Sequence, residues 1–463
     1  MSDINKQQAP CAGQTDTYIM NRRILTVILY FLPLSLCAQQ KWDLRACIEY
    51  GLKNNRSNAV YENEKKAADA MAREALAEYL PKVSLTGSVD NNLKVQQSVI
   101  PAGVFGPEPL KVAFSQKYNT NGTAQLDQAI YDQSLITGLK ANKYNKQQAD
   151  LNQTRNQETI IYNISNAYYQ IYVYREQLAL LKQNLDTYRR QMEITGLQVS
   201  KGVTLQKDLD KVTVDYNSAV SQLRVAESNL ALSENQLKYE MGYPINSAVP
   251  VDSLSQRDIQ NPALADKSDD VFQAGSRTDY QLSEVNVRLL EIDQKRIKAG
   301  ALPKLTGYFR YGAVGFGSTL NPAFTDLNPF SAVGLKLSIP VFDFFKRDAQ
   351  YNQAKYKSLN AAETLKLDEG KYQLEYENAR TKLLKAQTNV ENDKRNIDLA
   401  RSVFTTTDLQ YKKGVTDLID WLNTQNSIKE AQNNYLNSLF NYYQAKMDLA
   451  KAAGTLKTFY STL

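Results

Sequence analysis

The stretch LQVSKGVT at residues 197–204 returns as LQYKKGVT at residues 409–416, with the same opening leucine and five further identities. The same spacing of 212 residues maps Asn166-Ala167 onto Asn378-Ala379, and Gly242 onto Gly454. A register kept over such a distance is typical of an internal repeat, and a repeat decides the fold. The sequence therefore predicts two copies of one structural unit.

Each copy of this stretch is expected to be the turn between two long helices. Ahead of the turns, apolar residues step by three and four positions. In the first copy they are Ile164, Ala167, Ile171, Tyr174, Leu178, Leu181, Leu185, Tyr188 and Met192, and in the second they are Tyr376, Ala379, Leu383, Ala386, Val390, Asp393 (the one polar member), Ile397, Ala400 and Phe404. A seven-residue apolar repeat predicts coiled-coil packing. The helix expected over Ser134–Thr195 would be about 90 Å long at 1.5 Å per residue.

Upstream of its hairpin, each unit has the pattern of one helix and two strands. The helices are expected at Leu44–Glu78 and Tyr280–Ala299, and a Leu-Pro-Lys sequence follows each, because proline disfavours helical geometry in the residue before it. Alternation of apolar and polar residues over Leu305–Phe316 and Val333–Ile339 is typical of strands with one apolar face. We count two strands per unit and four per chain.

The composition excludes several classes of function. The 463 residues include no histidine and three cysteines, and the formal net charge is +6. Without an imidazole, no Ser-His-Asp system and no histidine metal site can form, so neither an enzyme nor a cofactor is expected. The charge is too mild to indicate nucleic-acid binding. A mean hydropathy of −0.48 excludes a membrane protein with several helical spans, but not a β-barrel, whose strands are apolar only at alternate positions.

Residues 1–38 are expected to be an upstream extension and a signal peptide. Two arginines precede the apolar stretch Ile24–Leu36, and the small residue Ala38 fits a cleavage site. An uncleaved anchor is one alternative. Lipidation at Cys37 is another, which the large leucines just before it disfavour. After cleavage Cys47 is the only cysteine left, so no internal disulfide is expected.

The repeat sets the expected domain boundaries. The first helix-strand-strand-helix-helix unit is expected over residues 39–243 and the second over residues 278–463. Residues 244–277, rich in Ser, Asp, Pro and Asn, are expected to be an irregular connector.

Four strands are too few to close a membrane barrel, since known barrels start at about eight strands. An open sheet edge cannot face lipid, because each unpaired backbone group there costs several kcal/mol. Strands that span a membrane must therefore be shared: two copies would give eight strands and three would give twelve. Ile100–Pro109 and Asn321–Pro329 would then be extracellular loops. The alternative is a soluble sheet that caps a coiled coil.

The arrangement of these features resembles that of the TolC-type outer-membrane efflux proteins over residues 42–457. The resemblance rests on the Leu-Pro-Lys sequences at Leu80–Lys82 and Leu302–Lys304, on the repeated Leu-x-x-x-x-Gly turns, and on the duplicated order of elements. It implies a mainly α fold with a membrane β-barrel. In that fold a homotrimer shares one 12-stranded barrel, four strands per chain, which twelve helices continue as an α-barrel across the periplasm.

The resemblance also implies a function. The chain would be a passive exit duct of a tripartite efflux or type I secretion system, held in outer-membrane lipid and extending into the periplasm. It would contact a periplasmic adaptor (a membrane fusion protein) and, through it, an inner-membrane pump or secretion ATPase. The competing hypothesis is a soluble periplasmic coiled-coil scaffold. The sequence does not indicate the cargo.

In this family, acidic side chains six and nine residues after the turn glycine narrow the tunnel. Counting from the second glycine gives Asp420 and Asn423, and counting from the first gives Asp208 and Lys211. The candidate periplasmic constriction is therefore Asp420, Asn423 and Asp208. The alternative role for the two acids is to offset the positive end of the helix dipole, worth about 0.3–1 kcal/mol. Thr416 stands where the family has a basic residue, so the closed state must be latched differently.

The two turns themselves have a second implied role. The resemblance implies that the adaptor contacts them, with the candidate residues Lys201, Gly202, Val203, Lys413, Gly414 and Val415. The simpler role of the two glycines is to provide a left-handed residue at the end of a helix.

Overall fold

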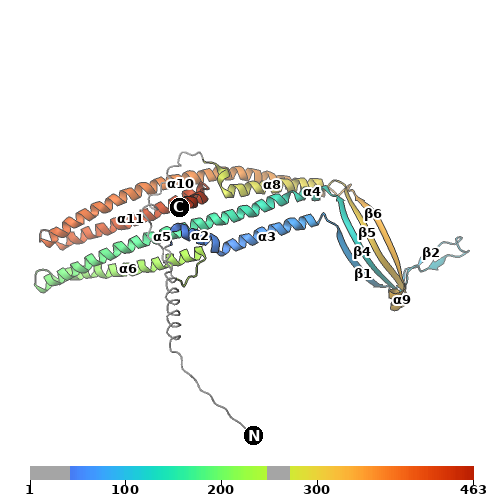
Figure 1. Ribbon diagram of the computed structural model, residues 1–463, viewed down its shortest axis with the longest axis horizontal. Helices are drawn as coiled ribbons and strands as arrows, with labels where there is room; N and C mark the ends of the chain where they lie inside the picture. Colours follow the sequence, from blue (N-terminus) through green and yellow to red (C-terminus); the bar gives the residue numbers. More distant parts are fainter. Residues whose placement is uncertain (1–41, 248–271) are drawn as a thin grey trace, which may run out of the picture.

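The computed structural model describes residues 42–247 and 272–463, and Figure 1 shows an elongated molecule with long helices at one end and a small sheet at the other. The signal peptide expected at residues 1–38, including Cys37, lies outside the described residues. So do residues 248–271, most of the expected connector.

The first repeat begins with two helices and ends with a long helical hairpin. Its helices are α2 (Leu44–Asn54), α3 (Arg56–Ala77), α4 (Gln133–Leu139), α5 (Ala141–Ser200) and α6 (Gln206–Met241). Its strands are β1 (Lys82–Asn91), β2 (Ser98–Ile100), β3 (Leu110–Val112) and β4 (Tyr118–Tyr131).

The second repeat has the same order of main elements, with the short helix α9 where the first has the β2–β3 hairpin. Its helices are η3 (Ala274–Ser276), α8 (Thr278–Ala299), α9 (Leu320–Thr325), α10 (Lys346–Lys412), α11 (Leu418–Ala452) and α12 (Leu456–Thr462). Its strands are β5 (Lys304–Gly317) and β6 (Leu327–Ser338). The helix expected to open this repeat is confirmed as α8.

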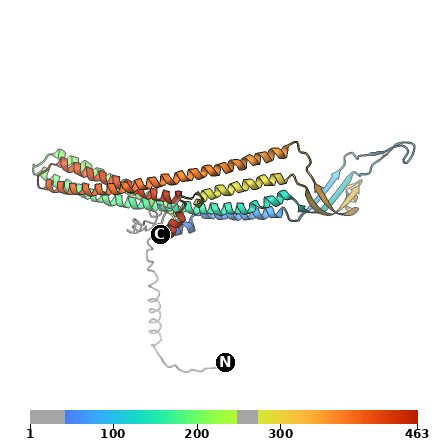
Figure 2. The same ribbon diagram turned by 90° about the horizontal axis from the view of Figure 1, so that it is seen from above.

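The hairpins α5–α6 and α10–α11 run side by side, with their turns at the end of the molecule farthest from the sheet (Figures 1 and 2). The expected apolar seam is confirmed: Ile164, Ile171 and Tyr188 of α5 are fully buried. α5 packs against α6 within its own hairpin and against α11 of the other. Burying such a side chain is worth about 1.5–3 kcal/mol, so this seam holds the two repeats together.

The largest apolar core lies midway along the molecule, where α2, α5, α6, α11 and α12 meet. Its fully buried members include Ile48, Ile164, Leu237, Met241 and Met447. The core thus joins the start of the first repeat to the end of the second and fixes how the hairpins project from it.

The strands form one antiparallel sheet in the order β1-β4-β5-β6, and a separate hairpin β2-β3 projects beyond it. One continuous row across the sheet is Thr86, Thr123, Gly312 and Phe330. The central β4–β5 pair joins the two repeats, so the sheet is completed only when both copies of the unit are folded.

Two helices expected to be continuous are broken, and these predictions are wrong in detail. The helix expected over Leu44–Glu78 stops at Asn54 and restarts at Arg56, because Asn55 leaves helical geometry. The Asn55 side chain accepts a hydrogen bond from the Ser57 N–H at 2.9 Å and donates one to the Glu240 carbonyl at 2.6 Å. A side chain that caps the following helix in this way competes with the continuous helix. Lys140, just after Gly138, separates α4 from α5 as well, but it keeps helical backbone angles (φ −64°, ψ −23°).

The strand predictions also need correction. Four strands form the sheet as expected, but the count per chain missed β2 and β3, which extend the loop expected at Ile100–Pro109. The loop expected at Asn321–Pro329 ends too late, because Asn328 and Pro329 belong to β6 and lie opposite Val314 and Ala313. Proline is tolerated there because β6 is an edge strand of the protomer.

Candidate functional site

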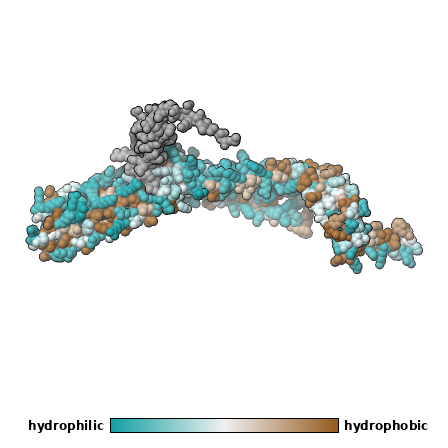
Figure 3. Space-filling view, turned by 60° about the horizontal axis from the view of Figure 1, so that its bottom comes forward, coloured by the Kyte–Doolittle hydropathy of each residue, from teal (hydrophilic) through white to brown (hydrophobic). Residues whose placement is uncertain are grey.

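The sheet has one apolar and one polar face, because directly opposed residues of antiparallel strands point to the same side. The apolar face carries Val83, Leu85, Val89, Ala124, Leu126, Leu305, Phe309, Tyr311, Val333, Leu335 and Leu337. The other face is mainly polar, with Ser84, Thr86, Ser88, Asn121, Thr123, Gln125, Asp127, Arg310 and Lys336, and it also carries Tyr308, Val314, Phe316 and Phe330. Leu85 and Val333 are each 82% exposed, and Figure 3 shows apolar residues gathered at this end. One face of the sheet therefore suits an apolar environment, and the other suits water.

The sheet also has two open edges. Within the described residues β1 pairs only with β4, and β6 pairs only with β5. Each edge strand therefore keeps a row of backbone groups available to another strand.

The two hairpin turns are nearly identical in geometry. Gly202 and Gly414 have φ values of +71° and +72°. In the first turn the Val203 N–H donates to the Gln198 carbonyl at 2.9 Å, and in the second the Val415 N–H donates to the Gln410 carbonyl at 2.9 Å. This pattern ends a helix with a left-handed residue. Gly202 and Gly414 therefore serve as left-handed residues at the ends of α5 and α10.

The residues around these turns are exposed. Val203 and Val415 are 73% and 72% exposed, although valine is apolar. Lys201 and Lys413, next to the turn glycines, are exposed as well. The tips thus present a basic and an apolar side chain each, at the extreme end of the helices.

Asp208 and Asp420 occupy matching places just after the turns. Each lies in the first turn of its helix, α6 or α11. The Thr204 hydroxyl donates to Asp208 Oδ2 at 2.9 Å, and the Thr416 hydroxyl donates to Asp420 Oδ2 at 2.8 Å. Thr416 therefore holds the acid by a hydrogen bond from a neutral donor.

Asn423 lies in a different environment from these acids. It lines an open groove between the beginnings of α6 and α11, together with Lys207, Lys211, Asp215 and Asn426. The structure thus brings Asn423 and Lys211 to one groove, whereas Asp208 and Asp420 are not among its lining residues.

Trp421, to which the sequence assigned no role, organises the contact between the hairpins near the tips. Its indole is 1% exposed and packs edge-on against Tyr188 of α5 and Phe404 of α10. Its Nε1–H donates to Asp408 Oδ1 at 3.0 Å. The only sequence signal for this role is the apolar position itself, since its partners come from two other helices.

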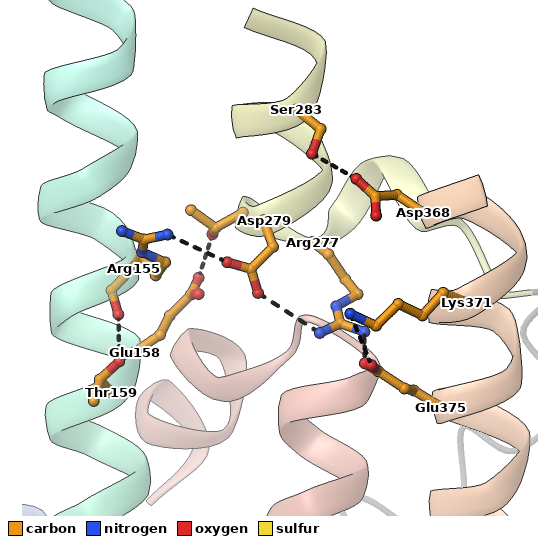
Figure 4. A network of polar contacts seen from close by, with 10 residues as sticks. Arg155, Glu158, Thr159, Arg277, Asp279, Ser283, Asp368, Lys371 and Glu375 are labelled. Atoms are coloured by element: carbon orange, nitrogen blue, oxygen red, sulfur yellow. Dashed lines mark hydrogen bonds and ion pairs between the residues drawn. The ribbon is translucent and has the colours of Figure 1, made fainter. Parts of the chain in front are cut away.

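A second cluster that the sequence missed surrounds Arg277, at the start of the second repeat (Figure 4). The Arg277 side chain is only 7% exposed, and its Nη1 lies 2.6 Å from Glu375 Oε2 on α10. Its Nη2 lies 3.7 Å from Asp279, and the guanidinium stacks 4.0 Å from the Tyr372 ring centroid. This arginine therefore fixes the beginning of α8 to α10.

The same cluster reaches the first repeat through Glu158 of α5. The Thr278 hydroxyl donates to Glu158 Oε1 at 2.7 Å, and Arg155 lies 3.9 Å from Asp279 (Figure 4). Burial raises the pKa of Glu158, although the Thr278 hydrogen bond and the nearby Lys457 act against this. Figure 4 thus shows a polar joint between α5, α8 and α10.

Across residues 42–247 and 272–463, no group of three or more His, Cys, Asp or Glu side chains is placed to hold a metal ion. Cys47 is buried, and burial raises the pKa of its thiol to about 12, which leaves it unreactive. No helix in the part of the chain that the structure describes is long and apolar enough to cross a membrane.

Comparisons of sequence give a consistent result. A family model described as outer membrane efflux protein matches residues 48–242 and 277–455. The outer membrane protein TolC of Escherichia coli K12 is 22% identical over 352 residues, which cover 73% of this chain and 70% of the relative. The pyoverdine export outer membrane protein OpmQ of Pseudomonas putida is 23% identical over 429 residues, which cover 89% of this chain and 86% of the relative.

Solved structures share the fold. CusC superposes with a TM-score of 0.73 at 14% identity, covering 89% of this chain and 91% of that chain. VceC of Vibrio cholerae superposes with a TM-score of 0.71 at 16% identity, covering 89% and 96%. The expected fold, with long helical hairpins and a four-stranded sheet for a shared barrel, is confirmed, and so is location in the outer membrane. Because the family model matches most of both repeats, the chain belongs to the family of outer membrane efflux proteins.

Proposed function

We propose that three copies of this chain form the passive exit duct of an efflux system, crossing the outer membrane and the periplasm. The observation that carries the proposal is the sheet, which has an exposed apolar face, a polar face and two open edges. Pairing β6 of one copy with β1 of the next removes every edge, as lipid requires. The apolar faces then contact lipid and the polar faces line a water-filled lumen.

The number of copies follows from the family resemblance and from size. Two copies would give eight strands, and a barrel of eight is only wide enough for its own side chains or one small ligand. Three copies give twelve strands and leave room for cargo. This supports a trimer.

The helices support the same assembly. α10 carries leucines that no other part of the described chain covers: Leu367, Leu374, Leu384 and Leu399 are 60–73% exposed. In a closed ring of hairpins these side chains would pack against a neighbouring copy. The tunnel would then continue from the sheet to the turns.

The tips are the proposed contact with a periplasmic adaptor and, through it, with an inner-membrane pump. Support comes from their exposure at the end of the hairpins and from their matching geometry. The contact residues would be Lys201, Gly202, Val203, Lys413, Gly414 and Val415.

The proposed constriction comprises Asp420, Asn423 and Asp208. Three Asp420 carboxylates around one axis would attract cations and respond to divalent ions. The exposure of Asp420 at the start of α11 supports this role. Its hydrogen bond from Thr416 equally suits the alternative, in which the acid stabilises the start of the helix.

One experiment tests the duct directly. The protein is extracted from outer membranes in mild detergent, its mass is measured by light scattering, and it is added to a planar lipid bilayer. We expect the mass of three chains and stepwise conductance. A monomer that gives no current, or a chain recovered in the soluble periplasmic fraction, would refute the duct and favour the scaffold.

A further inference from the structure

The short helix α9 lies on the apolar face of the sheet, at the end farthest from the long helices (Figure 1). It follows β5 directly, and the register puts Gly315 opposite Thr120 on that face. A Cβ atom at Gly315 would collide with the Ala323 carbonyl, and one at Gly317 would lie 2.8 Å from the Ala323 nitrogen. Two glycines therefore make the space in which α9 rests.

The position of α9 is fixed by specific contacts. Ala323 is fully buried against the sheet, and its carbonyl accepts a hydrogen bond from the Thr120 hydroxyl. The Asp326 N–H donates to the Pro322 carbonyl at 3.0 Å and ends the helix. α9 is thus a built part of the outer wall of the sheet.

The side of α9 that does not contact the sheet is apolar. Leu320 and Phe324 are one helical turn apart and therefore share a face. They are 52% and 51% exposed. This patch continues the apolar face that includes Tyr311, which is 58% exposed.

A second copy of the chain cannot cover this patch in the proposed barrel. α9 contacts β4 and β5, the two central strands of the sheet. Copies would join at β1 and β6, the outer strands. The patch therefore faces whatever surrounds the barrel.

The position of α9 along the strand sets its depth. Leu305 and Gly315 lie at opposite ends of the apolar part of β5. Ten residues at about 3.4 Å, in a strand tilted by about 40°, span roughly 26 Å along the membrane normal. An apolar band is about 25 Å tall, so Gly315 and α9 fall at its outer boundary.

We propose that α9 is an interfacial anchor for the outer leaflet. In this proposal, which rests on the proposed duct, Leu320 and Phe324 insert among lipid acyl chains just below the headgroups. A small amphipathic helix with aromatic and leucine side chains suits that layer. The anchor fixes the depth of the barrel from the extracellular side.

To test this, a tryptophan is introduced by Phe324→Trp, and the full-length trimer of this variant is reconstituted in phosphatidylcholine vesicles for fluorescence measurements. The lipid carries bromine on acyl carbons near the headgroup, and iodide is added to the water in a parallel sample. The native Trp42 and Trp421 lie in the helical part and give a constant background. We expect brominated lipid, but not iodide, to remove most of the emission that the new tryptophan adds.

Two control variants make the result decisive. Phe330→Trp places the probe on the polar face of the same sheet end, where Phe330 lies over Gly312, and brominated lipid should not quench it. Leu335→Trp places it on the apolar face near the opposite boundary of the band, across from Gly307, where lipid brominated near the headgroup should also quench it. If the Phe324 variant does not assemble, Leu320→Trp probes the same helix face.

The outcomes separate the anchor from the duct. If Leu335→Trp is quenched by brominated lipid but Phe324→Trp is quenched only by iodide, α9 stands in water and the anchor is wrong. If neither reagent quenches Phe324→Trp, protein covers the helix and the anchor is equally wrong. If Leu335→Trp is not quenched by brominated lipid, the sheet is not in a membrane and the proposed function itself fails.

Discussion

The two helical hairpins occupy matching places in the sequence repeat but differ in burial. α5 has more than twice as many buried residues as α10, although α10 is the longer helix. α5 is enclosed by α2, α3, α6, α8, α11 and α12, whereas α10 contacts mainly α8 and α11. A duplicated pattern therefore does not give duplicated surroundings: one hairpin completes its core within the chain, and the other leaves apolar surface for a neighbour.

The largest expected change in stability distinguishes the buried core around α5 from the exposed surface of α10 that a neighbouring copy would cover. Ile164→Ala removes a fully buried side chain of α5 and should cost about 2–5 kcal/mol of unfolding free energy. Leu399→Ala truncates an exposed leucine of α10, so it should leave the unfolding of the dissociated chain unchanged and reduce the fraction of trimer. Thermal unfolding and light scattering measure the two quantities. If the two variants changed unfolding stability equally and also changed the fraction of trimer equally, the hairpins would not differ in burial.

A smaller effect is expected at the polar joint, where two cations share one acid. Arg277→Met removes a nearly buried partner of Glu375, and because Glu375 is 41% exposed, we expect a loss of about 1–3 kcal/mol. Lys371→Met removes a 64% exposed partner at 3.9 Å and should cost at most about 1 kcal/mol. Chemical denaturation distinguishes them. A cost for Lys371→Met that matches that of Arg277→Met would mean that burial does not decide the strength of this joint.

The tips allow a comparison between the repeats in a working channel. Asp420→Ala should raise single-channel conductance and weaken block by divalent cations if the carboxylate narrows the tunnel. Asp208→Ala should cost only about 0.3–1 kcal/mol of stability, as expected for an acid at a helix start. Thr416→Val is the control, since it removes the hydrogen bond to Asp420 but keeps the charge. The same conductance change in this control would assign the effect to tip geometry rather than to charge.

The smallest effect concerns pH at the joint between repeats. Burial raises the pKa of Glu158 above its ordinary value of 4.5, so the ionised side chain opposes folding at neutral pH, and this opposition disappears as pH falls through the raised pKa. Glu158→Gln should therefore raise stability slightly at neutral pH, and this gain should vanish as pH falls below 4.5. Melting temperatures measured across this range test the sign, and a variant that is less stable at neutral pH would contradict it.

Long periodic patterns in the sequence predicted their elements correctly. The three-and-four stepping from Ile164 to Met192 predicted a helix with a buried seam, and the alternation over Val333–Ile339 predicted a strand with an apolar face. Both hold because such patterns depend only on the geometry of one element. The turn glycines Gly202 and Gly414 were predicted for a similarly local reason.

Sequence reasoning failed where a residue's role depends on another element. Asn55 breaks a helix because it bonds to Glu240, which lies 185 residues away. Arg277 looked like part of a connector until Glu375 and Tyr372 were placed beside it. The sequence predicted a loop where α9 lies. The packing of Ala323 on Gly315, which makes α9 part of the outer face of the sheet, joins residues of two different elements.

The sequence by itself determined the repeat, the helical hairpins, their turns and the two-faced strands. The reason is that apolar residues recur every 3.6 residues in a helix and every 2 in a strand, and each recurrence lies within one segment. Only the tertiary structure decided which hairpin is enclosed, which strands stay at the edges and where the polar joint forms. These depend on contacts between residues far apart in the chain, whose free energies arise only once the elements have packed.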